Sequence, residues 1–356
     1  MIHFLAVFSN QAGYTAYVVH VLEHVSLKLY STMRLGGFAR FVCDVTNEDE
    51  LLEVLAFAKG HGVPHRVIGS GSNIIWRDEG YDGLLIVNKI DGFETHDDGL
   101  TITIGAGMKW DDAVARTVEM GLSGIEFLSL IPGTAGATPV QNVGAYGREI
   151  KDVFVRLRAY DTQDETFVTL DREACSFKYR SSRFKAEDNG RYVITAITLK
   201  LNRDSPQPPF YDALQTYLDV QHITDYSPAS IRDAVIAIRS SKLPDPAKVA
   251  NNGSFFANPV IQTPRFEKLQ SRYIDAKGWP YQDGVKVAAG WLVEKAGFSD
   301  FHDEETGMAT WSKQNLVLVN EHARSTEDLL KFKQKIVSTV KEKFGITLEQ
   351  EPEILP

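Results

Sequence analysis

Several features that point to particular protein classes are absent from this 356-residue sequence. Only two cysteines are present, Cys43 and Cys175, and they are far apart and lack the spacing of a metal-ligand set. Their scarcity argues against a disulfide framework and favours a reducing compartment. No apolar run approaches the roughly 20 residues that a membrane span needs. The sequence therefore predicts a cytoplasmic protein with no membrane partner.

Positive charge is also in short supply. Lys and Arg number 38 against 47 Asp and Glu, which gives a formal net charge of −9, and no basic tail is present. This balance argues against nucleic acid as the main partner, although local basic clusters can still bind a small anion. Residues 1–24 contain neither Lys nor Arg and are a poor match to a signal peptide. We expect residues 1–24 to form an N-terminal extension.

The common catalytic motifs are missing as well. The sequence has no GxSxG elbow, no GxxxxGK[ST] loop, no HExxH pair and no cysteine pair suited to zinc. No metal site is therefore expected. The glycines of GAGMKW are not an ordered GxGxxG at the start of a βαβ helix, so a Rossmann cofactor domain is only weakly supported.

Two glycine-rich segments stand out among the features that are present. One is the turn GSGSN at residues 69–73, and the other is the loop Pro132–Gly147. Glycine allows the backbone to come close to a ligand and lets successive N–H groups converge on an anion. Either segment alone could be an ordinary turn. Together they favour a bound nucleotide or dinucleotide.

Hydrophobic periodicity and end signals predict the main elements. Helices are expected over residues 48–62, 110–120, 228–239 and 325–344, the last opened by a capping box at Ser325. Strands are expected at 192–201 and in the tail 346–355. The proline-rich segment 202–212 indicates a boundary, and the chain length suits two or three domains.

Three polar residues are candidates for chemistry. Arg180 can hold a carboxylate or phosphate through two N–H groups, Ser254 lies between Gly253 and Phe255, and Glu353 follows Pro352. Each also has an ordinary interpretation: a surface ion pair, a turn serine and an exposed tail carboxylate. No spacing rule connects them, so only a fold could relate them.

The segments VIGSGSNIIW, IPGTAGATPVQNVGAYG, FKYRSSRFK, SSKLPDP, NNGSFFANPV, AAGWLVEKAG and LEQEPEIL, in this order, resemble those of the UDP-N-acetylenolpyruvoylglucosamine reductase family. The resemblance covers about residues 32–355, and Tyr211 in the proline-rich loop is similar to the subgroup with a tyrosine loop. It implies an α+β, three-domain flavoprotein with a vanillyl-alcohol-oxidase-like FAD-binding fold and an α/β substrate domain. The implied domains are residues 25–88 with 337–356, residues 89–215, and residues 216–336.

The resemblance also implies a reaction and a set of residues. NADPH would reduce bound FAD, and the flavin would then pass hydride to a UDP-sugar enolpyruvate during peptidoglycan precursor synthesis, a step tied to cell shape and division. Ser254 would supply the proton, while Arg180 and Glu353 would stabilise the enolate. Lys242 is also the candidate to support Ser254, because a serine hydroxyl is a poor acid by itself. The implied FAD contacts are Gly69, Ser70, Gly71, Ser72, Asn73, Pro132, Gly133, Gly136, Ala137, Gln141, Asn142 and Gly144. The implied contacts to the UDP-sugar or NADPH are Tyr146, Tyr179, Tyr211, Lys242, Asn258, Lys286 and Gln314.

Some points depart from the family pattern or leave alternatives open. Trp311 stands where relatives often have a histidine, which puts the substrate contacts near Gln314 in question. Glu353 is preferred over Glu349 and Glu351 because it alone follows a proline and precedes an apolar pair. One alternative is an FAD oxidase of a small hydroxy acid or sugar, and another is a sugar-nucleotide binding protein without turnover. We expect a monomer.

Overall fold

The computed structural model describes residues 3–7 and 18–356, and the chain forms two compact units. Unit 1 consists of Met1–Val25, Ala39–Ser70 and Tyr81–Arg239. Unit 2 consists of Ser26–Phe38, Gly71–Gly80 and Ser240–Pro356. Each unit is thus assembled from segments far apart in the sequence. The predicted three-domain boundaries stay a prediction.

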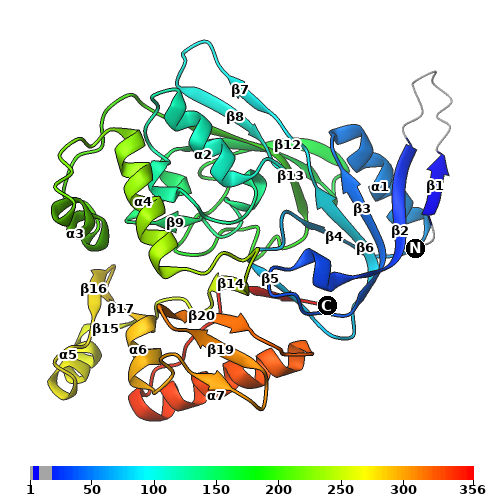
Figure 1. Cartoon of the computed structure of the whole chain (residues 1–356). Helices are drawn as coiled ribbons and strands as arrows, with labels where there is room; N and C mark the ends of the chain where they lie inside the picture. Colours follow the sequence, from blue (N-terminus) through cyan, green and yellow to red (C-terminus); the bar gives the residue numbers. More distant parts are fainter. Residues whose placement is uncertain (1–2, 8–17) are drawn as a thin grey trace. The chain divides into compact units, whose positions relative to one another are not determined.

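The first sheet of unit 1 has the strand order β1-β2-β3-β6-β4. Its strands are β1 His3–Val7, β2 Val18–Ser26, β3 Phe38–Val45, β4 His65–Ile68 and β6 Tyr81–Asn88. Strands β3 and β4 both pair in parallel with β6. Helix α1, Glu48–Gly60, begins where the Asn47 side chain accepts the N–H of Glu50, and its apolar face packs on this sheet (Figure 1). The predicted extension, residues 1–24, overlaps β2, whose Val19 and Val21 are buried in the same core; residues 1–2 and 8–17 lie outside the described part.

The second sheet of unit 1 is antiparallel, with the order β12-β11-β13-β8-β7. Its strands are β7 Phe93–Thr95, β8 Thr101–Gly105, β11 Phe154–Asp161, β12 Thr166–Asp171 and β13 Tyr192–Lys200. Helix α2, Trp110–Glu119, contributes Trp110 and Val114 to the core of this sheet (Figure 1). The smaller elements of the unit are η2 Glu126–Leu128, η3 Ala135–Ala137, β9 Gly144–Ala145, β10 Arg148–Glu149, η4 Ile150–Asp152 and α3 Asp212–Val220. Helix α4, Pro228–Lys242, follows, and its buried residues pack with those of α3.

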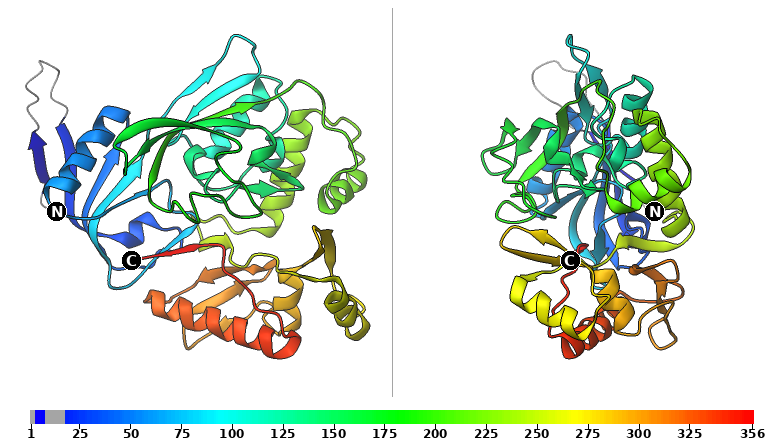
Figure 2. Two further views of the ribbon diagram at one scale, coloured as in Figure 1. Left: turned by 180° about the vertical axis from the view of Figure 1, so that it is seen from behind. Right: turned by 90° about the vertical axis from the view of Figure 1, so that its left-hand side faces the viewer.

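Unit 2 is built around the four-stranded sheet β14-β20-β19-β18. Its strands and short helices are η1 Leu27–Tyr30, β5 Ile74–Trp76, β14 Ala250–Ser254, β15 Val260–Gln262, α5 Thr263–Arg272, β16 Gly278–Tyr281, β17 Gly284–Val287, α6 Ala289–Lys295, β18 His302–Asp303, β19 Met308–Trp311, β20 Gln314–Asn320 and β21 Glu353–Leu355. Helix α7, Thr326–Phe344, and α6 pack on this sheet and on each other (Figure 2). Strand β21 pairs in parallel with β5.

The element predictions with strong local signals are confirmed. Helix α7 begins with the Ser325 capping box and ends at Gly345, which has a left-handed φ of 70°. Helix α4 runs to Lys242, three residues beyond the expected end. The tail is shorter than predicted as a strand: only Glu353–Leu355 is extended and paired, and its partner is β5. The predicted α+β class is confirmed. Within residues 3–7 and 18–356, no helix has the length and apolar character that a membrane crossing requires.

Candidate functional site

The glycine loop Pro132–Gly147 in unit 1 is fixed by contacts within the protein. The N–H of Gly136 donates to the carbonyl of Ala106 at 2.9 Å, and a Cβ at Gly136 would lie only 2.5 Å from that of Ala106. The carbonyl of Gly133 accepts the N–H of Trp110 at 3.1 Å. The loop is therefore held close against β8 and the start of α2, with backbone approaches that a larger residue would prevent.

The first glycine turn is equally restricted. A Cβ at Gly69 would lie 2.3 Å from Oγ1 of Thr134, so within unit 1 this turn touches the glycine loop. In unit 2, Gly71 has a φ of 71°, and its carbonyl accepts the N–H of Thr32 at 3.1 Å. The two predicted glycine segments thus meet at Gly69, as a phosphate cradle made from both requires.

Asn142, a predicted FAD contact, uses its side chain inside the loop. Its Nδ2 donates to Oε2 of Glu149 at 3.0 Å and to the carbonyl of Lys178 at 3.1 Å, while its Oδ1 accepts the N–H of Lys151 at 3.2 Å. The residue is fully buried and has a φ of 47°, in the left-handed region that asparagine tolerates. The side chain therefore braces the glycine loop against the segment that carries Arg180, and its predicted contact with FAD stays a prediction.

Arg180 projects from a tight turn between Lys178 and Ser181, whose backbones bond to each other in both directions. Its φ of 52° places it in the left-handed region, which is unusual for arginine. The guanidinium donates to the carbonyl of Gly144 at 2.9 Å and lies 5.2 Å from the ring centroid of Tyr179. Arg180 and the glycine loop are therefore in direct contact within unit 1. A residue kept in a sparsely populated conformation is commonly part of a functional site.

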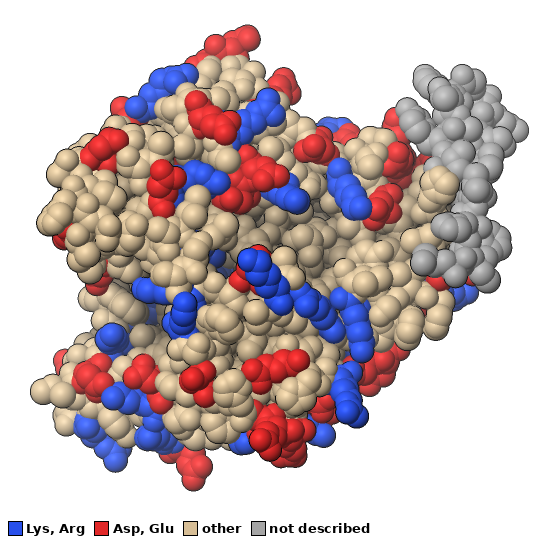
Figure 3. All heavy atoms as spheres, viewed as in Figure 1, with Lys and Arg blue, Asp and Glu red and all other residues tan. Residues whose placement is uncertain are grey.

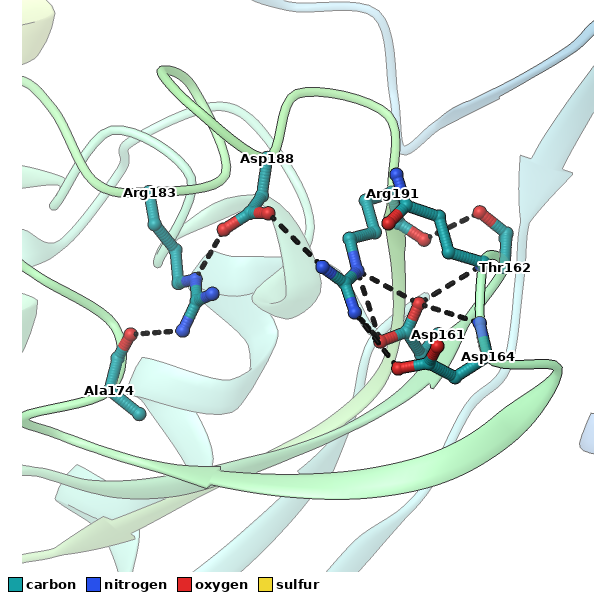
Figure 4. A network of polar contacts seen from close by, with 8 residues as sticks. Asp161, Thr162, Asp164, Ala174, Arg183, Asp188 and Arg191 are labelled. Carbon is teal, nitrogen blue, oxygen red and sulfur yellow. Dashed lines mark hydrogen bonds and ion pairs between the residues drawn. The ribbon is translucent and has the colours of Figure 1, made fainter.

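A network of ion pairs fixes the segment around Arg180 at its far end (Figure 4). Arg191 bonds both carboxylate oxygens of Asp161, and Arg183 bonds Asp188 at 2.6 Å. The guanidinium of Arg191 holds the pKa of Asp161 well below its ordinary value, at about 2, against the opposing effect of burial. Closer to the turn, Ser182 donates to the carbonyl of Val140 in the glycine loop at 2.7 Å.

Two predicted substrate tyrosines lie together in unit 1. The rings of Tyr146 and Tyr211 meet edge to face with centroids 6.1 Å apart. Burial raises the pKa of both phenols, so they remain neutral hydrogen-bond donors near neutral pH. Tyr146 has a φ of 50°, and Tyr211 precedes α3.

The sequence analysis missed an arginine beside this pair. Arg239 is half-buried, and its guanidinium Nε is buried without a hydrogen-bond partner among the described residues. Burial lowers the pKa of Arg239, while Tyr146 and Asp111 act in the opposite direction. Asp111 already forms a two-bond pair with Arg232, at 2.7 and 2.9 Å. The charge on Arg239 is therefore poorly compensated within the protein, which suits an anionic ligand.

Ser254 and Glu353 in unit 2 are connected through the first glycine turn. Asn252, two residues before Ser254, donates from Nδ2 to the carbonyls of Ser72 and Ile74 at 3.1 and 3.3 Å. The N–H of Glu353 donates to the carbonyl of Asn73 at 3.0 Å. The strands that carry Ser254 and Glu353 thus both bond to residues 72–74.

Three predicted substrate residues of unit 2, Asn258, Lys286 and Gln314, lie near the start of α6. Oδ1 of Asn258 accepts the N–H of Ala289 at 2.9 Å, and Oε1 of Gln314 would lie 3.4 Å from a Cβ at Gly290. Lys286 pairs with Val260 across β15 and β17 and has its ammonium 4.1 Å from the ring centroid of Tyr281. Three predicted residues are therefore brought to one region of unit 2.

Four other residues have different surroundings. Lys242 is exposed at the end of α4, and no hydrogen bond joins it to Ser254 among the described residues; its predicted support of Ser254 stays a prediction. Nε1 of Trp311 is buried and has no hydrogen-bond partner in the described part of the chain. Burial raises the pKa of the thiols of Cys43 and Cys175 to about 12, so neither is a nucleophile near neutral pH.

Two further observations concern the charges on the surface and the side chains that could bind a metal ion. In the view of Figure 3, acidic and basic side chains are interspersed over the surface. Among residues 3–7 and 18–356, no three His, Cys, Asp or Glu side chains cluster in a way that could hold a metal ion.

Comparisons with known proteins agree with these features. Residues 39–171 match a family described as an FAD binding domain, and residues 245–355 match the C-terminal domain of UDP-N-acetylenolpyruvoylglucosamine reductase. Curated proteins with that reductase name include one from Cupriavidus pinatubonensis, 40% identical over 94% of this chain and 98% of its own length, and one from Pseudomonas aeruginosa, 38% identical over 93% and 98%. The crystal structure of such a reductase from Thermus caldophilus has a TM-score of 0.66, 22% identity and coverage of 95% of this chain and 100% of its own.

The glycine segments that meet at Gly69 both lie in the matched FAD-binding region, while Ser254, Lys286 and Glu353 lie in the matched C-terminal region. The predicted FAD-binding fold is confirmed, and the protein is an FAD-dependent oxidoreductase. Its identity to curated relatives extends over nearly the whole of both sequences. The chain therefore belongs to the UDP-N-acetylenolpyruvoylglucosamine reductase family.

Proposed function

We propose that this chain reduces the enolpyruvyl group of UDP-N-acetylglucosamine enolpyruvate to give UDP-N-acetylmuramate, with NADPH as the electron source. Bound FAD supplies the hydride chemistry that links NADPH to the sugar nucleotide. The reaction is a step of peptidoglycan precursor synthesis in the cytoplasm. The observation that carries the proposal is the connection of the Ser254 and Glu353 strands through residues 72–74, at the end of the first glycine turn and the start of β5.

Ser254 is the proposed proton donor. It ends β14 next to Gly253, whose φ of 71° only glycine adopts readily, and an added Cβ at Gly253 would meet no atom within 4 Å. The N–H of Gly253 donates to Oδ1 of Asn251 at 2.8 Å, and the N–H of Phe255 donates to the carbonyl of Leu316 at 2.7 Å. The backbone on both sides of Ser254 is thus fixed while the space beside it stays open, which suits transfer of a proton to a substrate carbon.

Arg180 and Glu353 are the proposed stabilisers of the enolate. The Arg180 guanidinium is oriented by the Gly144 carbonyl, so its position does not depend on the ligand. Glu353 is fixed through its backbone by Asn73 and by the pairing of β21 with β5. Groups that are already in place when charge develops stabilise it without reorganisation.

The residues assigned to binding of the UDP-sugar are Tyr146, Tyr179, Tyr211, Arg239, Lys242, Asn258, Lys286 and Gln314. The uncompensated guanidinium of Arg239 favours a phosphate or carboxylate. A protein with a net charge of −9 can still bind such an anion, because nearby groups outweigh the total charge.

The test begins with the purified holoenzyme. The protein should show the absorption bands of bound FAD, consume NADPH slowly by itself, and consume it rapidly when the UDP-sugar enolpyruvate is added. Rapid reoxidation of the reduced flavin by oxygen with release of peroxide, and no response to the UDP-sugar, would instead identify an oxidase. Binding of the UDP-sugar without consumption of NADPH would identify a protein that has lost turnover.

A further inference from the structure

The side chain of Asn252 is buried, and only its NH₂ group makes hydrogen bonds to the described residues. The residue is 7% exposed, and its Nδ2 lies 3.1 Å from Oγ1 of Thr32, 3.1 Å from the carbonyl of Ser72 and 3.3 Å from the carbonyl of Ile74. Its Oδ1 is also buried, and no described residue offers it a hydrogen bond. The amide orientation is well defined, because carbonyl oxygens only accept and so must face the NH₂ group.

An unpartnered buried acceptor is uncommon in a folded protein. Most buried polar side-chain atoms have a partner, and an exception calls for a ligand or a water that completes the site. The neighbouring Asn251 shows the usual outcome, since its Oδ1 accepts from Gly253 and its Nδ2 donates to Val249. Oδ1 of Asn252 therefore has no hydrogen-bond donor among the described residues, and a bound molecule could supply one.

The position of Asn252 indicates which molecule this is. Its Nδ2 donates to the carbonyls of Ser72 and Ile74. Ser72 lies in the first glycine turn and Ile74 follows it, and both lie within residues 39–171, the matched FAD-binding region. Asn252 itself lies within residues 245–355, the matched C-terminal region of the reductase family. A side chain from the C-terminal region thus bonds to the backbone of the FAD-binding turn and carries an unused acceptor there.

We propose that Oδ1 of Asn252 accepts a hydrogen bond from a hydroxyl or N–H group of bound FAD, which makes Asn252 a cofactor-binding residue contributed by the C-terminal region. The same side chain then links FAD to β14, two residues before Ser254. The inference deepens the proposed function, but it depends only on FAD binding and not on the identity of the sugar nucleotide.

The test measures the release of FAD from the holoenzyme after dilution, followed by the recovery of flavin fluorescence, with neither NADPH nor UDP-sugar present. Asn252→Leu has a similar shape and lacks the acceptor, and should release FAD roughly 5- to 100-fold faster, the range expected when a buried hydrogen bond loses one partner. Asn252→Thr keeps a hydroxyl that can donate to the Ser72 or Ile74 carbonyl and suits a strand. It should show the same faster release even if the leucine variant folds poorly.

The matched control is Thr32→Val, which removes one acceptor of Nδ2 and leaves Oδ1 of Asn252 untouched. This variant should have a lower Tm and an unchanged rate of FAD release. Unchanged release from both Asn252 variants would overturn the proposal and assign the free acceptor to a water. Equal acceleration in Thr32→Val would also overturn it, because the effect would then come from the link to the turn. Because no substrate is present, a failure of the proposed reductase activity would leave this result unaffected.

Discussion

The backbone N–H of Glu353 donates to the carbonyl of Asn73, at 3.0 Å. This bond joins the last strand of the chain to the first glycine turn, and the carbonyl of Glu351 also accepts Nδ2 of Asn73, at 3.4 Å. The N–H of Glu351 bonds instead to the carbonyl of Phe255, and the carbonyl of Glu349 accepts the N–H of Ala257. Glu349 is exposed, whereas Glu353 is half-buried. Burial separates Glu353 from Glu349 but not from Glu351, which is also half-buried, so the choice of Glu353 and its catalytic role stay predictions.

Replacement of Glu353 tests that role. Glu353→Gln keeps the size and the backbone bonds but removes the negative charge and the proton-sharing capacity. We expect kcat for the UDP-sugar reaction to fall about 100-fold or more, as for the loss of one preorganised group, with FAD content unchanged. Glu349→Gln is the matched control and should leave kcat within about twofold, since surface changes have small effects. Equal losses in the two variants would argue against a catalytic Glu353.

Ser254→Ala should separate the two half-reactions. Reduction of FAD by NADPH does not need the proposed proton donor and should stay close to the wild-type rate in stopped-flow absorbance measurements. Reoxidation by the UDP-sugar enolpyruvate should slow roughly 10²- to 10⁴-fold, the usual contribution of a general acid. Ser271→Ala, on the exposed side of α5, is the control and should change neither step. A parallel loss in both half-reactions would contradict the assigned role.

Arg239 and Arg232 lie two turns apart on α4 and provide a matched comparison. Arg239→Gln removes the poorly compensated charge, and we expect the Kd of the UDP-sugar, followed through the flavin spectrum, to rise roughly 10- to 100-fold. Arg232→Gln breaks the pair with Asp111, so it should lower the Tm. It also frees the Asp111 carboxylate to compensate Arg239, so the Kd should rise by less than in Arg239→Gln. An unchanged Kd in Arg239→Gln would remove this arginine from the binding site.

The sequence predicts features that local rules determine. The capping box at Ser325 and the αL glycine at Gly345 set the ends of α7 through contacts a few residues apart. The tail was predicted too long as a strand, because pairing with β5 depends on contacts nearly 280 residues away. Arg239 and Asn252 were missed for the same reason. Whether a buried polar atom has a partner depends on distant residues, and an arginine in an amphipathic helix gives no local sign of it.

The glycine loop allows a test of its packing. Gly136→Ala places a Cβ 2.5 Å from that of Ala106, where neither residue has a flexible end that can move away. We expect a loss of about 1–3 kcal/mol in stability from overpacking, together with weaker retention of FAD. The control is Gly60→Ala at the end of α1, where an added Cβ meets no atom within 4 Å. Thermal unfolding should show a lower Tm for the loop variant alone, and equal Tm values would contradict the tight packing.

The ion pair between Asp161 and Arg191 predicts a particular dependence of stability on pH. Arg191 lowers the pKa of the nearly fully buried Asp161 from 3.8 to about 2, so the folded state binds this proton less readily than the unfolded state. The stabilisation is therefore complete above about pH 4 and decreases as the pH falls toward 2. Asp161→Asn lacks this titration, so its Tm should be lower than that of the wild type at pH 6, and the difference should shrink below pH 4. Asp82→Asn, whose carboxylate is 87% exposed in its pair with Arg40, is the control and should differ little from the wild type at any pH. A Tm difference between Asp161→Asn and wild type that stays constant from pH 6 to pH 3 would show that the charge of Asp161 does not stabilise the fold.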